Sequence, residues 1–193
     1  MILIYYIIFF SACFLYPSVR TYLKTGINPI TFKNTQSAHD LIGWYMKLLI
    51  VSCLISGIIN LDNISLSLRT FHFFSWQKNL GMTLMLGSAF WVMVAQFQMS
   101  DSWRIGIDEQ HETALVTSGL FSISRNPIFL GMLVSLLGVT FYEFHLLNLF
   151  NFIFSFILIT IQVRLEEHFM KSTQKNGYEA YLNKTPRWIL LKF

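Results

Sequence analysis

The chain has 193 residues, of which 54% are hydrophobic and 12% are charged. A soluble domain carries about twice that share of charged residues, so the composition excludes an ordinary soluble protein and indicates an integral membrane protein. The net charge of +4 is spread along the chain, without a basic cluster that would bind nucleic acid.

Five apolar segments follow one another along the chain. A helix needs about 20 apolar residues to cross a bilayer, and each segment approaches or reaches that length. They are residues 1–19, 41–60, 80–99, 127–142 and 146–163. The fold class that we predict is therefore all-α: a single-domain, polytopic membrane helix bundle of about five spans, followed by a C-terminal cytoplasmic helix.

Polar segments connect and end these spans. Pro17 predicts that the first helix stops or kinks there, and residues 20–40 then form a loop. Residues 61–78 form the second connection, and residues 101–126 form the third and most polar one. Only three residues separate the last two spans, which predicts a tight helical hairpin. The charged tail begins at Arg164 and is expected to be helical to about Leu182.

The placement of the basic residues predicts the orientation. Of the 14 Lys and Arg residues, Arg69 and Lys78 lie in the second connection, and the others lie at the opposite side of the five spans. Because basic residues gather on the cytoplasmic side, we expect the N-terminus outside and the C-terminus in the cytoplasm. The third connection and the tail then share one side of the membrane and can meet.

The stretch SRNPIFLG places a cation at the start of the fourth span. Asn126 is a favoured N-cap residue and Pro127 a favoured first helical residue. A helix N-terminus presents unpaired N–H groups that attract anions, and Arg125 adds a full charge beside them. The alternative is that Arg125 only reaches lipid phosphates at the membrane surface.

Further candidates lie in the tail. Glu166 and Glu167 follow an apolar span directly, where a carboxylate needs water or a partner; ordinary pairs along the helix surface are the alternative. Adjacent positions point about 100° apart on a helix, so we expect one of the two to face a site squarely. Tyr178 and Tyr181 share a helix face, as membrane-interface anchors also do.

Metal chemistry is not expected from this sequence. The five histidines lack ligand spacing, and His111, within DEQHE, is interpreted as part of a solvated acidic loop. Cys13 and Cys53 both fall inside apolar runs, so we expect buried, packed thiols without a disulfide or a bound metal.

Taken together, the segments SWRIGID, LVTSGLF, SRNPIFLG, EEHF and GYEAYLNKTPRW resemble the C-terminal half of the isoprenylcysteine carboxyl methyltransferase and phospholipid N-methyltransferase superfamily. The resemblance covers residues 102–187. Three positions depart from the family pattern: Asn126 stands in place of a histidine, and Phe121 and Phe129 stand in place of tyrosines. The Arg-Asn-Pro form looks like a variant of bacterial members, which implies the inner membrane of a bacterium.

The resemblance implies S-adenosylmethionine as the cofactor, bound between the cytoplasmic ends of the last spans and the C-terminal helix. It divides the domain into three N-terminal spans (residues 1–99) and a cofactor-binding half (residues 100–193). The catalytic residues that it implies are Arg125 and Glu167. The implied cofactor-binding residues are Leu115, Val116, Gly119, Arg125, Asn126, Pro127, Phe129, Glu166, Glu167, Tyr178 and Tyr181.

The methyl acceptor stays open at this point. The superfamily methylates carboxylates, amines and thiols, so the substrate expected is a lipid or another lipophilic small molecule that reaches the site from the bilayer. Two other functions are compatible with the sequence: a nicotinamide-dependent membrane reductase of the sterol-reductase type, whose C-terminal region looks similar, and a non-enzymatic membrane interaction or transport protein. The oligomeric state is left open.

Overall fold

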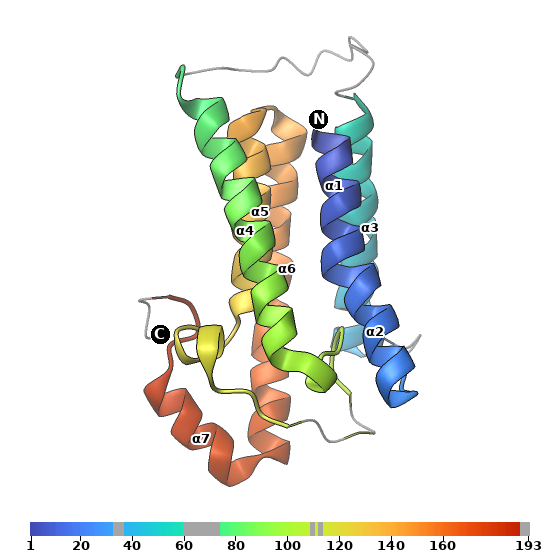
Figure 1. Cartoon of the computed structure of the whole chain (residues 1–193), viewed down its shortest axis with the longest axis vertical. Coiled ribbons are helices and arrows are strands. Elements are labelled where there is room, and N and C mark those ends of the chain that lie inside the picture. The colour runs from blue at the N-terminus through green and yellow to red at the C-terminus, as the bar shows by residue number, and fades with distance from the viewer. Residues whose placement is uncertain (33–36, 60–73, 109–110, 112–113, 190–193) are drawn as a thin grey trace.

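A computed structural model of the chain describes residues 1–32, 37–59, 74–108, 111 and 114–189. Within these ranges the protein is an all-α bundle, as predicted, and four of its helices are long and apolar enough to cross a membrane. A fifth, shorter apolar helix completes five passages from one end of the bundle to the other (Figure 1). Asn60 and Arg69, used above for a span boundary and for the charge count, lie outside the described residues.

The first passage runs further than predicted. It consists of α1 (Ile2–Phe10), a π-helical turn (Ser11–Leu15) and α2 (Tyr16–Thr25) in one continuous run. The prediction that residues 20–40 form a loop is wrong at its start, because the helix ends only at Gly26, which adopts the left-handed conformation (φ 70°) that favours glycine. The helix passes Pro17 without stopping.

A side chain from another helix satisfies the backbone at Pro17. Proline has no N–H to donate to the carbonyl four residues earlier, which is that of Cys13. The Gln96 side-chain amide donates a hydrogen bond to this carbonyl instead. The π-helical turn lies directly before Pro17. A tertiary contact therefore keeps the helix continuous at a position where the sequence alone predicts a break.

The next two passages begin a few residues earlier than predicted. They are α3 (Ala38–Ile59) and α4 (Gln77–Met99). Segments at the end of the bundle opposite the N-terminus, before α3 and after α4, meet in a short parallel bridge between Ile30 and Ile105. The Thr31 hydroxyl donates to the Ile105 carbonyl over 2.8 Å and strengthens this contact.

The helical hairpin is confirmed. It is formed by α5 (Pro127–Tyr142), whose bounds are those predicted, and α6 (Leu146–Thr173). At 28 residues α6 is about 42 Å long, so it projects beyond the other helices at the lower end of Figure 1. The chain turns at Gln174 and continues as α7 (Lys175–Lys184), which folds back beside α6. The tail is thus helical to Lys184, two residues beyond the predicted end, with one break.

Pairs of helices approach one another closely at the end of the bundle that holds the N-terminus. A Cβ atom on Gly57 of α3 would lie 2.8 Å from the Leu3 Cα of α1, and one on Gly81 of α4 would lie 2.7 Å from the Gly138 carbonyl of α5. Here we call this region the outer layer. Its contacts leave no room for side chains between these helix pairs.

Polar bonds join α3 to α6 in the same outer layer. The Ser52 hydroxyl donates to Asn151 Oδ1 over 2.7 Å, and the Ser56 hydroxyl donates to Asn148 Oδ1 over 2.5 Å. Asn148 also fixes the turn between α5 and α6, because its side-chain amide donates to the Glu143 carbonyl over 2.8 Å. These serine and asparagine side chains are thus paired across helices in the apolar part of the bundle.

Candidate functional site

The site is built around the start of α5. Asn126 precedes the first helical residue, Pro127, as predicted, but its side chain makes no capping bond to the helix. The Asn126 amide instead faces the C-terminal segment, where it donates to the Arg187 carbonyl over 3.4 Å. The neighbouring Ser124 hydroxyl donates to the same carbonyl over 3.0 Å. The start of α5 therefore holds the end of the tail.

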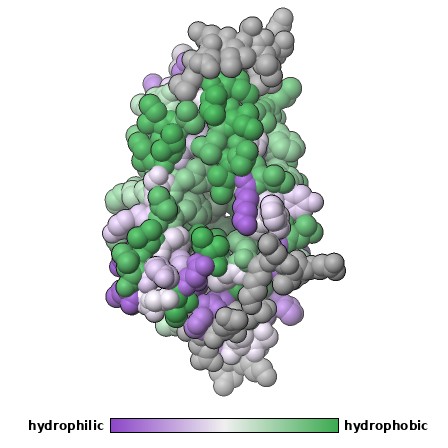
Figure 2. Space-filling model, turned by 90° about the vertical axis from the view of Figure 1, so that its right-hand side faces the viewer, coloured by the Kyte–Doolittle hydropathy of each residue, from purple (hydrophilic) through white to green (hydrophobic). Residues whose placement is uncertain are grey.

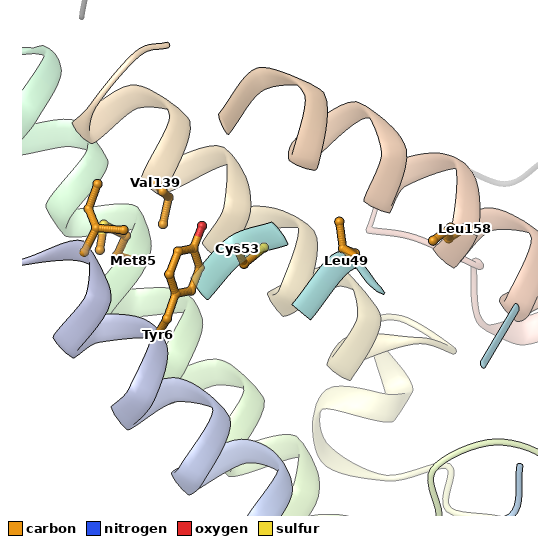
Figure 3. Close-up of a cluster of buried hydrophobic side chains, with 7 residues drawn as sticks. Tyr6, Leu49, Cys53, Met85, Val139 and Leu158 are labelled. Carbon is orange, nitrogen blue, oxygen red and sulfur yellow. The ribbon is translucent and has the colours of Figure 1, made fainter. Parts of the chain in front are cut away.

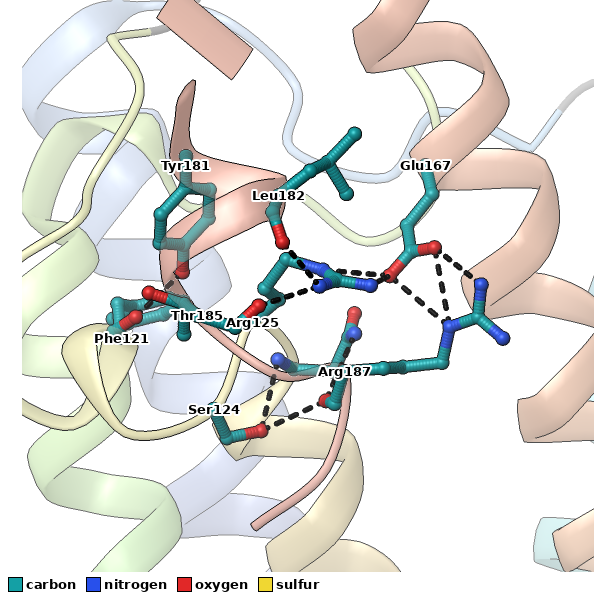
Figure 4. A network of polar contacts seen from close by, with 9 residues as sticks. Phe121, Ser124, Arg125, Glu167, Tyr181, Leu182, Thr185 and Arg187 are labelled. Atoms are coloured by element: carbon teal, nitrogen blue, oxygen red, sulfur yellow. Dashed lines mark hydrogen bonds and ion pairs between the residues drawn. The ribbon is translucent and has the colours of Figure 1, made fainter. Parts of the chain in front are cut away.

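Arg125, Glu167 and Arg187 form a buried ion-pair network, which we call the clamp (Figure 4). Arg125 Nη2 donates to Glu167 Oε1 over 2.9 Å, and Arg187 Nη2 donates to Glu167 Oε2 over 2.6 Å. Both Nε atoms also donate to this carboxylate. One carboxylate between two guanidinium groups has its lone pairs occupied by charge-assisted hydrogen bonds.

The clamp fixes the C-terminal segment to the membrane helices. The remaining Arg125 nitrogen, Nη1, donates to the carbonyls of Thr185 and Leu182 at the end of α7. The Arg125 backbone N–H donates to the Pro186 carbonyl over 2.9 Å. Every guanidinium nitrogen of Arg125 therefore has a partner within the protein. As a result, α7 is held against the start of α5 and the end of α6.

Glu166 and Glu167 differ in their surroundings. Glu167 is buried within the clamp, with 6% of its surface exposed. Glu166 lies outside the clamp and accepts one hydrogen bond, of 2.7 Å, from the Gln162 amide. The Gln162 Oε1 atom is buried without a hydrogen-bond partner among the described residues. One of the adjacent carboxylates is thus fully engaged by protein, while the other keeps accepting capacity.

A cavity of about 720 Å³ connects these residues. All the residues that the resemblance implied for the site line this cavity except Gly119. Gly119 has positive φ (62°), and a Cβ there would lie 2.4 Å from the Gln98 side chain, which accepts a hydrogen bond from the Leu120 N–H. The glycine therefore shapes the turn that precedes Phe121, rather than the cavity wall.

Two buried tyrosines lie at the polar end of the cavity. Tyr178 and Tyr181 are 4% and 7% exposed, and their rings are 6.0 Å apart. The Tyr181 hydroxyl donates to the Phe121 carbonyl over 2.6 Å. Burial raises the pKa of both phenols above the usual tyrosine value, so both stay neutral and keep their hydrogen at physiological pH.

The connections after α2 and α4 cover the same end of the cavity. Phe32, Ile105 and Ile107 line it. The ring of His39 stacks on Phe32 at 4.5 Å, and its Nε2 accepts a hydrogen bond of 2.9 Å from the Ile107 N–H. This cover ties the N-terminal half of the chain to the cavity.

The opposite arm of the cavity is apolar and lies between α1, α3, α5 and α6. Figure 2 shows a hollow in one face of the molecule, at the boundary between the apolar side chains above and the more polar ones below. Side chains from the membrane helices line this arm; they include Phe10, Phe14, Met46, Ile50, Met132 and Leu136. One cavity thus has a polar and an apolar end.

The histidine and the two cysteines that the sequence analysis left out of the site lie in ordinary structural positions. His111 is exposed and pairs with Asp108, as expected of a solvated loop. Cys13 and Cys53 are free and buried. Within the described residues, no group of three or more His, Cys, Asp or Glu side chains is placed to hold a metal ion.

Sequence reasoning missed three parts of the site. Arg187 was noted only within a motif, because its approach to Glu167 depends on the tail folding back across about 20 residues. Gln162 is one of several polar residues in the last span, together with Asn148, Asn151 and Ser155, so its residue type alone did not mark it as part of the site. The cover around Phe32 and Ile107 had no local signal, because it depends on contacts between distant connections.

Comparison with known proteins adds one finding. The sequence model of a family described as phospholipid methyltransferase matches residues 76–176, which include α4, α5, α6 and most of the cavity-lining residues of the third connection. No curated protein matches the chain, and no solved structure matches it.

Proposed function

The chain belongs to the phospholipid methyltransferase family, and from this premise we propose that it is an S-adenosylmethionine-dependent methyltransferase that acts within the membrane on a lipophilic acceptor. The family is one of methyltransferases, and the apolar helices agree with an enzyme embedded in a membrane. The cofactor and the class of acceptor are the parts that we propose.

The observation that carries this proposal is the continuity of the cavity. Its polar end is lined by the motif residues, including Arg125, Glu166 and Tyr178, and its apolar arm by side chains at the level of the membrane. A methyl donor that carries charged groups and an acceptor with a lipid tail need two such environments in contact. An in-line transfer then depends on alignment of the two reactants and on exclusion of water.

The residues present fit the proposed cofactor. S-adenosylmethionine supplies an electrophilic methyl group on a sulfonium, and it also offers an ammonium group and ribose hydroxyls as hydrogen-bond donors. The Glu166 carboxylate and the unpartnered Gln162 Oε1 are acceptors that line the cavity. A buried acceptor without a partner costs about 1–3 kcal/mol, and a donor on the ligand would remove that cost.

Arg125 and Glu167 have, in this proposal, a positioning role. Their charges are compensated within the clamp, so we assign to them the placement of α7 and of the Tyr178 ring beside the cofactor. We assign to Glu166 the role of the carboxylate that binds the cofactor. An acceptor that is already a carboxylate or a thiolate needs no base.

The orientation that we propose for the chain agrees with the same function. With the C-terminus in the cytoplasm, the polar end of the cavity faces the compartment in which a soluble cofactor circulates. The acceptor would then enter from the bilayer. The bacterial inner membrane is the location that we propose.

The first test is a titration with S-adenosylhomocysteine by calorimetry, in mild detergent. We expect saturable micromolar binding by the wild-type protein and a loss of about tenfold, or 1.4 kcal/mol, in Glu166→Gln. Glu179→Gln is the matched control, because Glu179 is an exposed glutamate of α7 that does not line the cavity. Acceptors with amine, thiol and carboxylate groups would be screened next.

Two other results would overturn the proposal. Absence of binding by folded wild-type protein would remove the cofactor from it, and the same protein would then be titrated with reduced nicotinamides, which a sterol-reductase-type enzyme binds. Binding of neither cofactor would favour a non-enzymatic role in the membrane.

A further inference from the structure

The apolar arm of the cavity ends at a wall inside the bundle. Tyr6 of α1 and Cys53 of α3 line the cavity and also belong to a cluster of buried side chains that includes Leu49, Met85 and Val139. They are 2% and 1% exposed. Figure 3 shows the Tyr6 ring extending from its helix towards Cys53 and Val139. These two side chains thus face the cavity on one side and the packed core on the other.

The outer layer closes the bundle behind this wall. Gly57 and Leu3 bring α1 against α3, and Ser56 and Asn148 join α3 to α6. None of these four residues lines the cavity. An apolar chain that enters from the polar end therefore meets Tyr6 and Cys53 before it meets the outer layer.

Two helices give the same length for this arm. On α6, the lining residues extend from Met170 to Ser155, and we count the part from Gln162 onward, beyond the two glutamates, as this arm. On α5 they extend from Pro127 to Leu136, and we count the part from Phe129 onward. Each interval is seven residues, or about 10 Å at the helical rise. An extended chain advances about 1.2 Å per bond, so the arm takes a chain of about eight atoms.

We propose that Tyr6 and Cys53 form the floor of a pocket for the tail of the methyl acceptor and so set the length of chain that is accepted. This inference rests on the proposed function and adds to it a substrate class: acceptors with one unbranched apolar chain that ends near the floor. A longer chain does not fit in the pocket. Its excess carbons have to extend out into the bilayer or displace Tyr6 and Cys53.

Chain length is tested directly with methyl transfer to n-alkyl amines, thiols and carboxylates of about four to about fourteen carbons, a range that brackets the length of the arm. For the wild type we expect kcat/KM to rise about fourfold for each buried methylene, to reach a maximum near eight, and then to stop rising. In Tyr6→Ala the maximum moves to chains longer by about two carbons or more. Cys53→Leu moves it to shorter chains.

Tyr6→Phe is the matched control. It keeps the ring that forms the floor and removes only a hydroxyl whose polar neighbour is the Cys53 thiol. We expect its length profile to equal that of the wild type. An unmoved maximum in a Tyr6→Ala protein that still binds S-adenosylhomocysteine would overturn the inference.

The two cysteines offer a second test that does not need activity. Cys13 and Cys53 are both buried in apolar helices, but only Cys53 lines the cavity. A short n-alkyl methanethiosulfonate forms a disulfide with a thiolate and releases methanesulfinate. Peptide mass spectrometry should show Cys53 modified at least about tenfold faster than Cys13, a ratio that corresponds to about 1.4 kcal/mol.

The two proposals fail in different ways. Equal labelling of the two cysteines would refute the tail pocket, even if the protein binds the cofactor. Selective labelling of Cys53 in a protein that does not bind S-adenosylhomocysteine would keep the pocket and refute the methyltransferase.

Discussion

Glu166 and Glu167 are adjacent residues with the same side chain and opposite surroundings. Glu167 accepts hydrogen bonds from Arg125 and Arg187, while Glu166 accepts one from Gln162 and faces the cavity. The direction of a helical side chain changes by about 100° from one residue to the next, which is enough to place one carboxylate in the clamp and the other in the cavity. We therefore expect their substitutions to affect different properties.

Replacing Glu167 by Gln should lower the free energy of unfolding by about 3 kcal/mol, because removal of one partner leaves buried charges uncompensated. Glu166→Gln should change it by less than about 1 kcal/mol, since no buried ion pair is lost. Thermal unfolding in detergent, compared between the two variants, measures this difference. Equal losses of stability would show that the clamp does not hold the tail as we describe.

The candidate site could be predicted in part from residue types. Arg125 and the two glutamates were found because charges beside apolar spans are rare, and the structure brings their segments together. The pairing of Glu167 with Arg187 could not be predicted, since it depends on the course of the tail after Gln174. Gly119 was assigned to the site by resemblance, whereas its conformation serves the turn against Gln98.

At the scale of elements, helix boundaries were predicted most accurately where the local signals are strong. Asn126–Pro127 marks the start of α5 because both residues have strong local preferences there. The first helix was predicted to end near Pro17, and it continues to Thr25 because Gln96 supplies the hydrogen bond that proline cannot. Local signals are reliable only where no distant side chain replaces the missing partner.

This explanation of the first helix predicts a coupling between two residues. Gln96→Leu should cost about 1–3 kcal/mol, because it leaves the buried Cys13 carbonyl without a donor. In a Pro17→Ala background the new backbone N–H can donate to that carbonyl, so the same substitution should cost less. A double-mutant cycle measured by unfolding gives the coupling; additive effects would contradict it.

The close approach of α4 to α5 predicts how a glycine-to-alanine substitution on α4 changes the stability of the protein. A Cβ on Gly81 would lie 2.4 Å from the Tyr142 nitrogen, which is backbone and cannot move aside, so Gly81→Ala should destabilise the protein by about 2 kcal/mol or more. Gly87, on the same helix, has nothing within 4 Å of such a Cβ. Gly87→Ala should be neutral or stabilise by up to about 1 kcal/mol, from helix propensity.

For the molecule as a whole, the odd number of passages places the N-terminus and α7 at opposite ends of the bundle (Figure 1). The described residues contain one basic residue, Lys78, near the end of the bundle that holds the N-terminus, whereas many lie near the other end. The positive-inside rule then gives the orientation that the proposed function requires.

Fusions test this orientation. A fluorescent protein joined after Phe193 should fold and fluoresce, as it does in the cytoplasm, and alkaline phosphatase joined there should be inactive. Joined after Trp76, at the other end of the bundle, the two reporters should give the reverse result. The same result at both positions would mean that one passage does not cross the membrane.

The outer layer has a consequence for the cell as well as for the fold. A cavity that reaches far into a membrane protein is a potential conduit for ions, and an electrical potential of 100 mV drives each elementary charge with about 2.3 kcal/mol. The contacts of Gly57, Ser56 and Asn148 close the bundle behind the cavity. Among the described residues the hollow is closed at this end, so we expect the protein not to conduct ions across an energised membrane.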